Sequence, residues 1–283
     1  MFHLYRTRAV VGCVLIALGG CAGSPDEKPT SGAGASLEHV HGLGVDPKDG
    51  VLYAGTHHGI FRVTRTSIEG PVADRQQDFM GFTVVGPGHF LASGHPGPGQ
   101  DGPGALGLLE STDGGKTWKT RSLAGQADCH ALAAGAGTTY CMNSVIGELL
   151  ASTDLRSWDV RSAEPVFDVA VNGSDPDAVI VTTEQGLKSS SDGGRTFRPV
   201  RDAPVLLFVE WLTDDSLIGA GPDGQVFVRS PGQEAFAKVG MLSGPPEAFH
   251  AADPKDFFAS VGGKIWASSD RGQTFRRLGY DSH

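Results

Sequence analysis

Two histidines, His39 and His41, stand two residues apart at the start of an apolar run, in the segment "EHVHGLGVD" over residues 38–46. In a β-strand, residues i and i+2 point to the same side of the sheet, so these two imidazoles are expected to face the same way. Paired imidazoles suit metal ligation, acid–base exchange, or hydrogen bonding to a polar ligand. The choice between these depends on where the strand lies in the fold.

A repeat in the sequence predicts the elements that position these histidines. The octapeptide "STDGGKTW" occupies residues 111–118, close copies occupy 190–197 and 268–275, and weaker copies occupy 152–158 and 230–236. In the copies that contain the Asp, its carboxylate can accept hydrogen bonds from its own turn; glycines, where present, supply positive φ, and the final aromatic ring can pack between units. The copy at 230–236 has Pro231 in place of the Asp. The carboxylates expected in this structural role are Asp113, Asp154, Asp192 and Asp270.

The octapeptide resembles the Asp-box, or BNR, motif of sialidase-like β-propellers, and the resemblance covers most of residues 39–279. A spacing of about 40 residues suits blades of four antiparallel strands. No stretch has sustained helical periodicity, and the 41 glycines suit many tight turns. The sequence therefore predicts an all-β, six-bladed β-propeller over residues 38–283, with Asp-box hairpins in its four-stranded blades. Blades are expected to open near residues 39, 80, 127, 165, 204 and 245.

The resemblance extends to bacterial exported lipoproteins labelled glycosylhydrolase-like, through the segments "HVHGL" (39–43), "MGF" (80–82), "SGHPG" (93–97) and "DCH" (128–130). In a propeller, the inner strand of each blade lines the central channel. Its start shares one face with the loop between the second and third strands. We name this face the top face, and the four segments are expected to lie on it.

The N-terminal segment predicts export. Two arginines, Arg6 and Arg8, precede a short apolar run, and the residues "LGGC" ending at Cys21 resemble a bacterial lipobox. We expect a signal peptide over 1–20, lipidation of Cys21, and a flexible tether over 21–37. The expected location is the extracytoplasmic face of the cell envelope, with the membrane as a partner through the anchor.

Two further cysteines, Cys129 and Cys141, flank a segment that predicts strand, glycine turn and strand. In an exported protein a disulfide between them is expected, with two buried thiols as the alternative. A turn centred on Gly135 would place the two cysteines directly opposite each other in the hairpin.

Most histidines fall on the predicted top face of blades 1 to 3, with Asp78 and Asp128 nearby. Met80 and Asp168 take the inner-strand position in blades 2 and 4. Imidazole ligands suit copper or zinc, and Met80 would favour copper. The same residues could instead bind a polar ligand without a metal. The top-face histidines are His39, His41, His57, His58, His95 and His130, and all except His58 are expected metal ligands.

Two classes of function remain. The sequence argues against the sialidase activity that the resemblance implies, because the three top-face arginines of that family cannot be assembled. Another glycoside hydrolase would need two carboxyl groups across the cleft, although solvation at strand ends is the ordinary explanation for such groups. The sequence favours ligand binding, metal binding or a scaffold role, with an unknown small molecule, glycan or envelope protein at the top face. The net charge of −9 argues against nucleic acid. The carboxyl candidates for catalysis are Asp128, Asp168 and Glu210, followed by Glu184 and Glu247.

Overall fold

The computed structural model describes residues 37–212 and 215–279. The expected signal peptide, Cys21 and the tether up to residue 36 lie outside the described residues. Within the described part of the chain, no helix has the length and apolar character needed to cross a bilayer.

The first three blades are each one contiguous, four-stranded antiparallel sheet with the strands in sequence order. A single turn of 3-10 helix, η1 (Val72–Asp74), lies in the connection from blade 1 to blade 2. The strands are β1 (Val40–Asp46), β2 (Val51–Thr56), β3 (Gly59–Val63) and β4 (Ile68–Glu69) in blade 1; β5 (Asp78–Gly86), β6 (His89–His95), β7 (Leu108–Ser111) and β8 (Lys119–Ser122) in blade 2; and β9 (Cys129–Gly135), β10 (Thr138–Asn143), β11 (Glu148–Ser152) and β12 (Asp159–Ser162) in blade 3.

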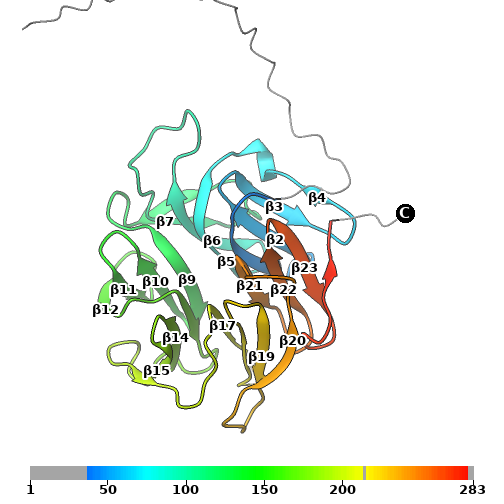
Figure 1. Cartoon of the computed structure of the whole chain (residues 1–283). Coiled ribbons are helices and arrows are strands. Elements are labelled where there is room, and N and C mark those ends of the chain that lie inside the picture. The colour runs from blue at the N-terminus through cyan, green and yellow to red at the C-terminus, as the bar shows by residue number, and fades with distance from the viewer. Residues whose placement is uncertain (1–36, 213–214, 280–283) are drawn as a thin grey trace, which may run out of the picture. The chain divides into compact units, whose positions relative to one another are not determined.

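The last three blades have the same topology. The six sheets stand around a ring, with the blue strands of blade 1 next to the red strands of blade 6 (Figure 1). The strands are β13 (Asp168–Val171), β14 (Val179–Thr183), β15 (Gly186–Ser190) and β16 (Arg198–Pro199) in blade 4; β17 (Phe208–Trp211), β18 (Leu217–Ala220), β19 (Gln225–Arg229) and β20 (Ala237–Met241) in blade 5; and β21 (Ala248–Ala251), β22 (Phe257–Val261), β23 (Lys264–Ser268) and β24 (Arg276–Arg277) in blade 6.

This architecture confirms the predicted six-bladed propeller. The place of Asp78 differs from the sequence expectation, because β5 begins at Asp78 and not at residue 80. Asp78 therefore opens an inner strand instead of ending the preceding blade. The ring closes by packing of blade 6 against blade 1 through buried side chains such as Leu43 and Ile265, and by the bond from Leu37 N to Gly263 O (2.7 Å).

The repeated octapeptide forms a hydrogen-bonded hairpin between the third and fourth strands. In blade 2, Asp113 accepts bonds from the Ser111 hydroxyl (2.8 Å), the Thr117 amide (2.9 Å) and the Thr117 hydroxyl (2.7 Å). Asp192 and Asp270 repeat this pattern in blades 4 and 6. The ring of Trp118 lies 5.0 Å from that of Phe79, inside a cluster shared by blades 1 and 2. These hairpins are therefore structural.

The inner strands of blades 1 to 3 each contain a β-bulge near the top face. Pairing of β1 with β2 skips His41, pairing of β5 with β6 skips Met80, and pairing of β9 with β10 skips His130. The inner pairs of blades 4 to 6 keep a regular register. A bulge re-aims the extra side chain and bends its strand, so three equivalent residues of neighbouring blades leave the regular alternation together.

Candidate metal centre and central channel

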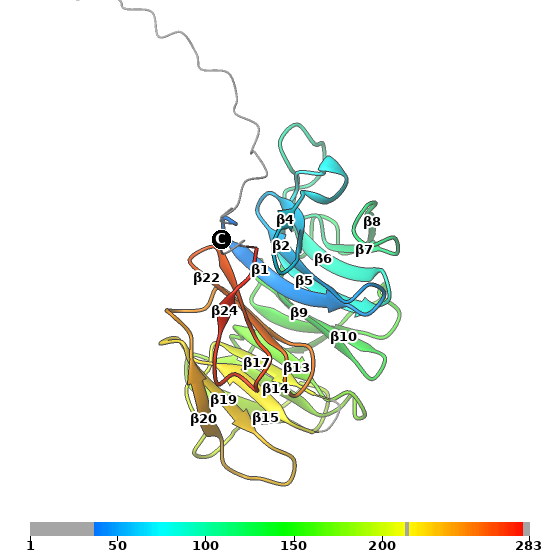
Figure 2. The ribbon, with the colours of Figure 1, turned by 90° about the vertical axis from the view of Figure 1, so that its right-hand side faces the viewer.

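Close packing of the inner strands brings the three bulges together. The residue after each bulge is small: Gly42, Gly81 and Ala131. A Cβ on Gly42 would lie 2.6 Å from the Phe82 carbonyl oxygen, and one on Gly81 would lie 2.0 Å from the Cys129 carbonyl oxygen. Only glycine permits such an approach. Strands β1, β5 and β9 consequently lie side by side (Figure 2).

A chain of imidazoles and carboxylates runs across the top of these three blades. His41 Nε2 lies 3.2 Å from His57 Nε2, and His57 Nδ1 lies 2.6 Å from Asp78 Oδ1. His57 directly follows β2, whose last residue pairs with Val40 of β1, so the loop places His57 beside His41. His39, whose φ is +48°, has its ring centroid 5.0 Å from that of His57. The structure therefore brings together three of the expected metal ligands.

His41 is held as a neutral imidazole. Burial and the nearby His57 together lower the pKa of His41 to about 4, although the Asp78 carboxylate acts in the opposite direction. Neutral imidazole is the form that binds a metal ion. Within the described part of the chain, His41, His57 and Asp78 are the group whose ligand atoms all lie within 4.8 Å of one another.

Asp78 links the two histidine loops of blades 1 and 2. Its Oδ1 contacts His57 Nδ1, and its Oδ2 lies 3.0 Å from His95 Nδ1. Burial raises the pKa of Asp78, but the hydrogen bonds from His95 and His57 outweigh burial and hold the pKa below 3.8. An Nδ1–H···carboxylate bond fixes the tautomer that leaves the His57 Nε2 lone pair free, as in metal-ligating histidines.

The chain continues through Asp128 to His130 of blade 3. Asp128 Oδ2 lies 3.3 Å from His95 Nε2 and 2.8 Å from His130 Nε2, and the carboxylate side chain is only 5% exposed. The hydrogen bond to Asp128 raises the pKa of His130 above 6.5 against the opposing effect of burial. His95 and His130 are thus joined through carboxylates and do not share the compact His41–His57 group.

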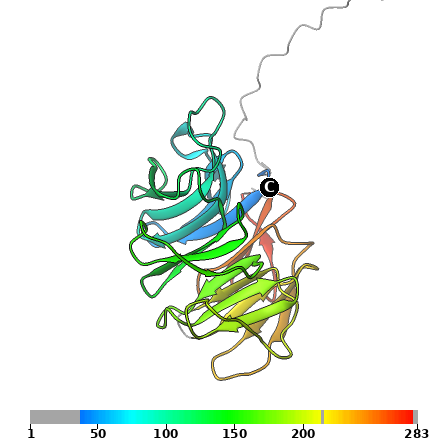
Figure 3. The same cartoon turned by 90° about the vertical axis from the view of Figure 1, so that its left-hand side faces the viewer.

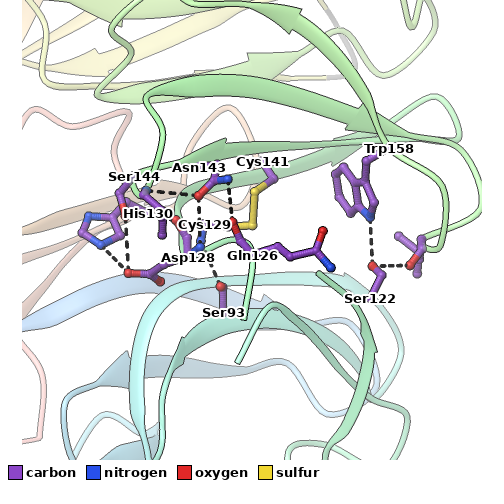
Figure 4. Close-up of a disulfide and its surroundings, with 12 residues drawn as sticks. Ser93, Ser122, Gln126, Asp128, Cys129, His130, Cys141, Asn143, Ser144 and Trp158 are labelled. Carbon is purple, nitrogen blue, oxygen red and sulfur yellow. Dashed lines mark hydrogen bonds and ion pairs between the residues drawn. A yellow bond between two sulfur atoms is a disulfide. The ribbon is translucent and has the colours of Figure 1, made fainter. Parts of the chain in front are cut away.

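The backbone around Asp128 is fixed by hydrogen bonds to residues of blades 2 and 3 (Figure 4). Asn143 accepts a bond from the Asp128 amide (3.2 Å), Ser144 donates its amide to the Asp128 carbonyl (2.9 Å), and Ser93 accepts the Cys129 amide (2.9 Å). Cys129 and Cys141 form a disulfide with a Cα–Cα distance of 5.1 Å.

The register of this hairpin differs from the sequence expectation. The turn is at Ala136 and Gly137, both with positive φ, and not at Gly135. Cys141 pairs with Leu132, and Cys129 pairs with Asn143 after the bulge, so the two cysteines are offset and not directly opposite. The bulge at His130 shortens the offset by one residue.

The central channel encloses about 210 Å³ and receives side chains from the inner strands of all six blades. His41 and His130 line the side of blades 1 to 3, whereas Asp168, Glu210 and His250 line the side of blades 4 to 6. Figure 3 shows the ring from the side of blades 3 and 4, whose green strands face the viewer. Desolvation, helped by the neighbouring Glu210 carboxylate, raises the pKa of Asp168 to about 7.

The other sequence candidates are more scattered. His58 points to Glu38 (3.2 Å) and is 59% exposed. Glu184 is exposed in the turn after β14, and Glu247 accepts bonds from Ser260 and Gly263. Met80 is half-buried at its bulge and does not line the channel. The structure adds His250, which sequence reasoning placed outside the site. The sequence feature that could have identified His250 is its place on the expected inner strand of blade 6.

No protein-family model and no curated protein matches this chain. Among solved structures, the GH74 enzyme of Niastella koreensis is 16% identical with a TM-score of 0.60, over 88% of this chain and 47% of that chain. The GH74 xyloglucanase of Xanthomonas campestris is 17% identical with a TM-score of 0.53, over 88% of this chain and 46% of that one. This chain therefore spans about half the length of those two enzymes.

The structure of YCF48 bound to D1 peptide is also similar, at 15% identity and a TM-score of 0.52, over 89% of this chain and 85% of that one. Likeness at these identities shows the fold alone. Fold and geometry together define a six-bladed β-propeller that carries a histidine–carboxylate cluster at the top of its channel. The similar solved structures include both GH74 enzymes and YCF48 bound to a peptide, so the function of this chain has to be argued from the cluster itself.

Proposed function

We propose that this protein is an extracytoplasmic propeller that binds a transition-metal ion, copper or zinc, through His41 and His57. The observation that carries the proposal is the pair of Nε2 atoms 3.2 Å apart. Two ligand atoms at that separation can both reach one ion at the usual zinc–nitrogen distance of about 2.0–2.1 Å. Asp78 supports the pair by orienting His57 through Nδ1.

Further ligands would come from residues already beside the pair. His39 lies near His57, and its ring stacks at 6.5 Å on that of His41. His41 also lines the channel, so a metal-bound ligand would have space there. The metal would supply Lewis acidity or a binding point for such a ligand. His95 and His130 act further out, where Asp78 and Asp128 join them to the pair.

The test is metal titration of the purified full chain after treatment with a chelator. Calorimetry with Cu(II), Zn(II) and Mg(II) should give one tight site for copper or zinc and none for magnesium. His41→Ala and His57→Ala should each weaken binding at least 100-fold. His58→Ala is the matched control, because His58 is adjacent in sequence but bonded to Glu38. Wild-type affinity in both variants, with unchanged circular dichroism, would overturn the proposal.

Export and lipidation at Cys21 remain part of the proposed function, supported by the lipobox-like segment. Cys21→Ser should move the protein from the membrane fraction to the extracytoplasmic soluble fraction. Membrane association that survives this substitution would remove the anchor from the proposal.

Glycoside hydrolysis is the alternative function. It draws on the fold likeness to GH74 enzymes and on two carboxyl groups in the channel, Asp168 and Glu210. A raised carboxyl pKa beside a second carboxyl is the arrangement of a general acid and its partner. Turnover of aryl glycosides or xyloglucan fragments that disappears in both Asp168→Asn and Glu210→Gln would favour this alternative over a binding role.

A further inference from the structure

The side of the channel formed by blades 4 to 6 has a character of its own. Asp168 opens β13, Glu210 is the third residue of β17, and His250 is the third residue of β21. We name these three residues the acidic wall. All three line the channel cavity of about 210 Å³, which has room for several water molecules.

Hydrogen bonds position the two carboxyl groups of the acidic wall, but no lysine or arginine in the described part of the channel lining neutralises their charge. Asp168 Oδ2 accepts a hydrogen bond from the Val209 amide (2.8 Å), and this bond crosses from blade 5 to blade 4. Glu210 Oε1 lies 2.9 Å from His250 Nδ1. Glu210 and His250 are 32% and 21% exposed, so both are reachable from the channel.

The channel offers these carboxyl groups no permanent positive charge. Among the described residues that line it, none is a lysine or an arginine. Like charges close together disfavour ionisation, and the raised pKa of Asp168 reports this repulsion together with desolvation. A cationic ligand would relieve the repulsion, a neutral ligand would leave it, and an anionic ligand would increase it.

A metal ion does not suit the acidic wall. Within residues 37–212 and 215–279, three ligand atoms of His, Cys, Asp or Glu come within 4.8 Å of one another only at His41, His57 and Asp78. The carboxylates and imidazole of the acidic wall are therefore too dispersed for one ion. They suit a larger cation whose charge is spread over several atoms.

Two aromatic side chains stand beside the acidic wall at the top end of the channel. Phe167 immediately precedes Asp168, lines the channel and is 53% exposed. Phe208 lines the channel two residues before Glu210 and is half-buried. An aromatic ring attracts ammonium groups through its negative face, most strongly where water is excluded. An exposed phenylalanine beside a carboxyl group is thus placed to contact the apolar surface of an organic cation.

We propose that the top end of the channel binds a small organic cation, whose ammonium group lies between Asp168 and Glu210 and beside Phe167 and Phe208. This site is on blades 4 and 5, whereas the metal pair His41 and His57 is on blade 1, where His41 lines the other side of the same channel. The expected ligand class is a primary or quaternary amine with a head group of about the size of choline.

The experiment uses the full chain after chelator treatment, so that its outcome does not depend on a metal. Choline is titrated by calorimetry beside 3,3-dimethyl-1-butanol, the neutral analogue of the same shape, and glucose. Choline should bind at least tenfold more tightly than its neutral analogue. Glu210→Gln should weaken choline binding at least tenfold. Glu184→Gln, at an exposed carboxylate outside the channel, should leave it unchanged.

Equal binding of choline and its neutral analogue would overturn the proposal, as would absence of choline binding or preferential binding of glucose. Loss of folding in Glu210→Gln is detected by its melting curve, and Phe167→Ala then serves as the second variant, since Phe167 is exposed. His57→Ala should retain choline binding while losing the metal. Failure of one site therefore leaves the other testable.

Discussion

Asp78 and Asp168 are each the first residue of an inner strand, in blades 2 and 4, although only Asp168 lines the channel. Burial raises the pKa of both carboxyl groups, but the net outcomes are opposite. Hydrogen bonds from His95 and His57 bring the pKa of Asp78 below 3.8, whereas Asp168 meets Glu210 and rises to about 7. The side chains that each carboxyl group meets, more than its burial, therefore set the direction of its pKa shift.

The same contrast extends to whole halves of the ring. Blades 1 to 3 have bulged inner strands, glycine-mediated close packing and imidazoles joined by carboxylates. Blades 4 to 6 have regular inner strands and carboxyl groups without a permanent cation. One repeat has thus produced a half with a histidine–carboxylate cluster, the proposed metal site, and a half with an acidic wall, and substitutions in each half can separate their roles.

The largest expected effect is at Asp168. The pKa of Asp168 rises from 3.8 to about 7. Ionisation of Asp168 therefore lowers the free energy of unfolding by roughly 4 kcal/mol at most, because each tenfold change in an acid constant is about 1.36 kcal/mol. For a carboxyl group with a raised folded-state pKa, stability falls as pH rises from about 4 to about 7 and then levels off. Asp168→Asn should therefore raise the free energy of unfolding at pH 8 by about 2–4 kcal/mol, with little effect at pH 4.

Urea unfolding of both proteins at the two pH values measures this gain. Asn can still accept the Val209 amide bond, so the hydrogen bond is preserved. Equal stability of wild type and variant at pH 8 would mean that Asp168 carries no desolvation penalty. The contrast with Asp78 would then be lost.

Next in size is the cross-link of blade 3, which has no counterpart in blades 4 to 6. The disulfide closes a loop with a sequence separation of 12, for which chain entropy gives about 3 kcal/mol. Cys129→Ala/Cys141→Ala should lower the free energy of unfolding by about that amount. Reduction of the wild type should lower its melting temperature similarly, and an unchanged melting temperature after complete reduction would contradict the expectation.

Asp78→Asn should act in the opposite direction to Asp168→Asn. A depressed folded-state pKa contributes stability that is present above pH 3.8 and lost as pH falls below it. Charge-assisted bonds to two imidazoles contribute about 2 kcal/mol, so the variant should be less stable by about that amount at pH 7. Its metal affinity should fall 10- to 100-fold, because the outer partner of His57 is lost.

Denaturation and metal titration at pH 7 check both effects of Asp78→Asn. The matched variant is Asp168→Asn, which should keep wild-type metal affinity. A stabilising effect of Asp78→Asn would show that its imidazole partners do not compensate its burial.

The smallest expected effect is at Met80, the bulge residue between His41 and His130 in blade order. A thioether favours copper(I) and contributes little to zinc. Met80→Leu should lower copper(I) affinity by less than tenfold and leave zinc affinity unchanged, as measured by competition with a chromogenic chelator. Loss of affinity for both metals would instead indicate a packing role for Met80.

The repeat predicted the propeller because its hairpin is local: the Ser, Asp, Thr and aromatic positions of residues 111–118 satisfy one another within one turn. The histidine-rich top face of blades 1 to 3 was also predictable from strand order. The details of the site were not. Bulges set the directions of the His41, Met80 and His130 side chains. These bulges depend on how neighbouring inner strands pack, and they leave no periodic signal in the sequence.

Two further misses have the same origin. Asp78 was assigned to the end of blade 1, because strand boundaries shift by one or two residues when a bulge absorbs an extra one. His250 has no neighbouring histidine in sequence, and its partner Glu210 lies 40 residues away on another blade. Contacts between blades are tertiary, so a sequence read blade by blade does not contain them.

The bond between Leu37 and Gly263 has a mechanical consequence. Leu37, the first described residue, is buried between blades 1 and 6 and donates its amide to blade 6, although the chain continues into blade 1. Tension arriving along the chain from residues before Leu37 would therefore be divided between the first and last blades. A force applied there would act on the contact between blades 1 and 6. Separation of β1 from its sheet would therefore require Leu37 to leave blade 6 first.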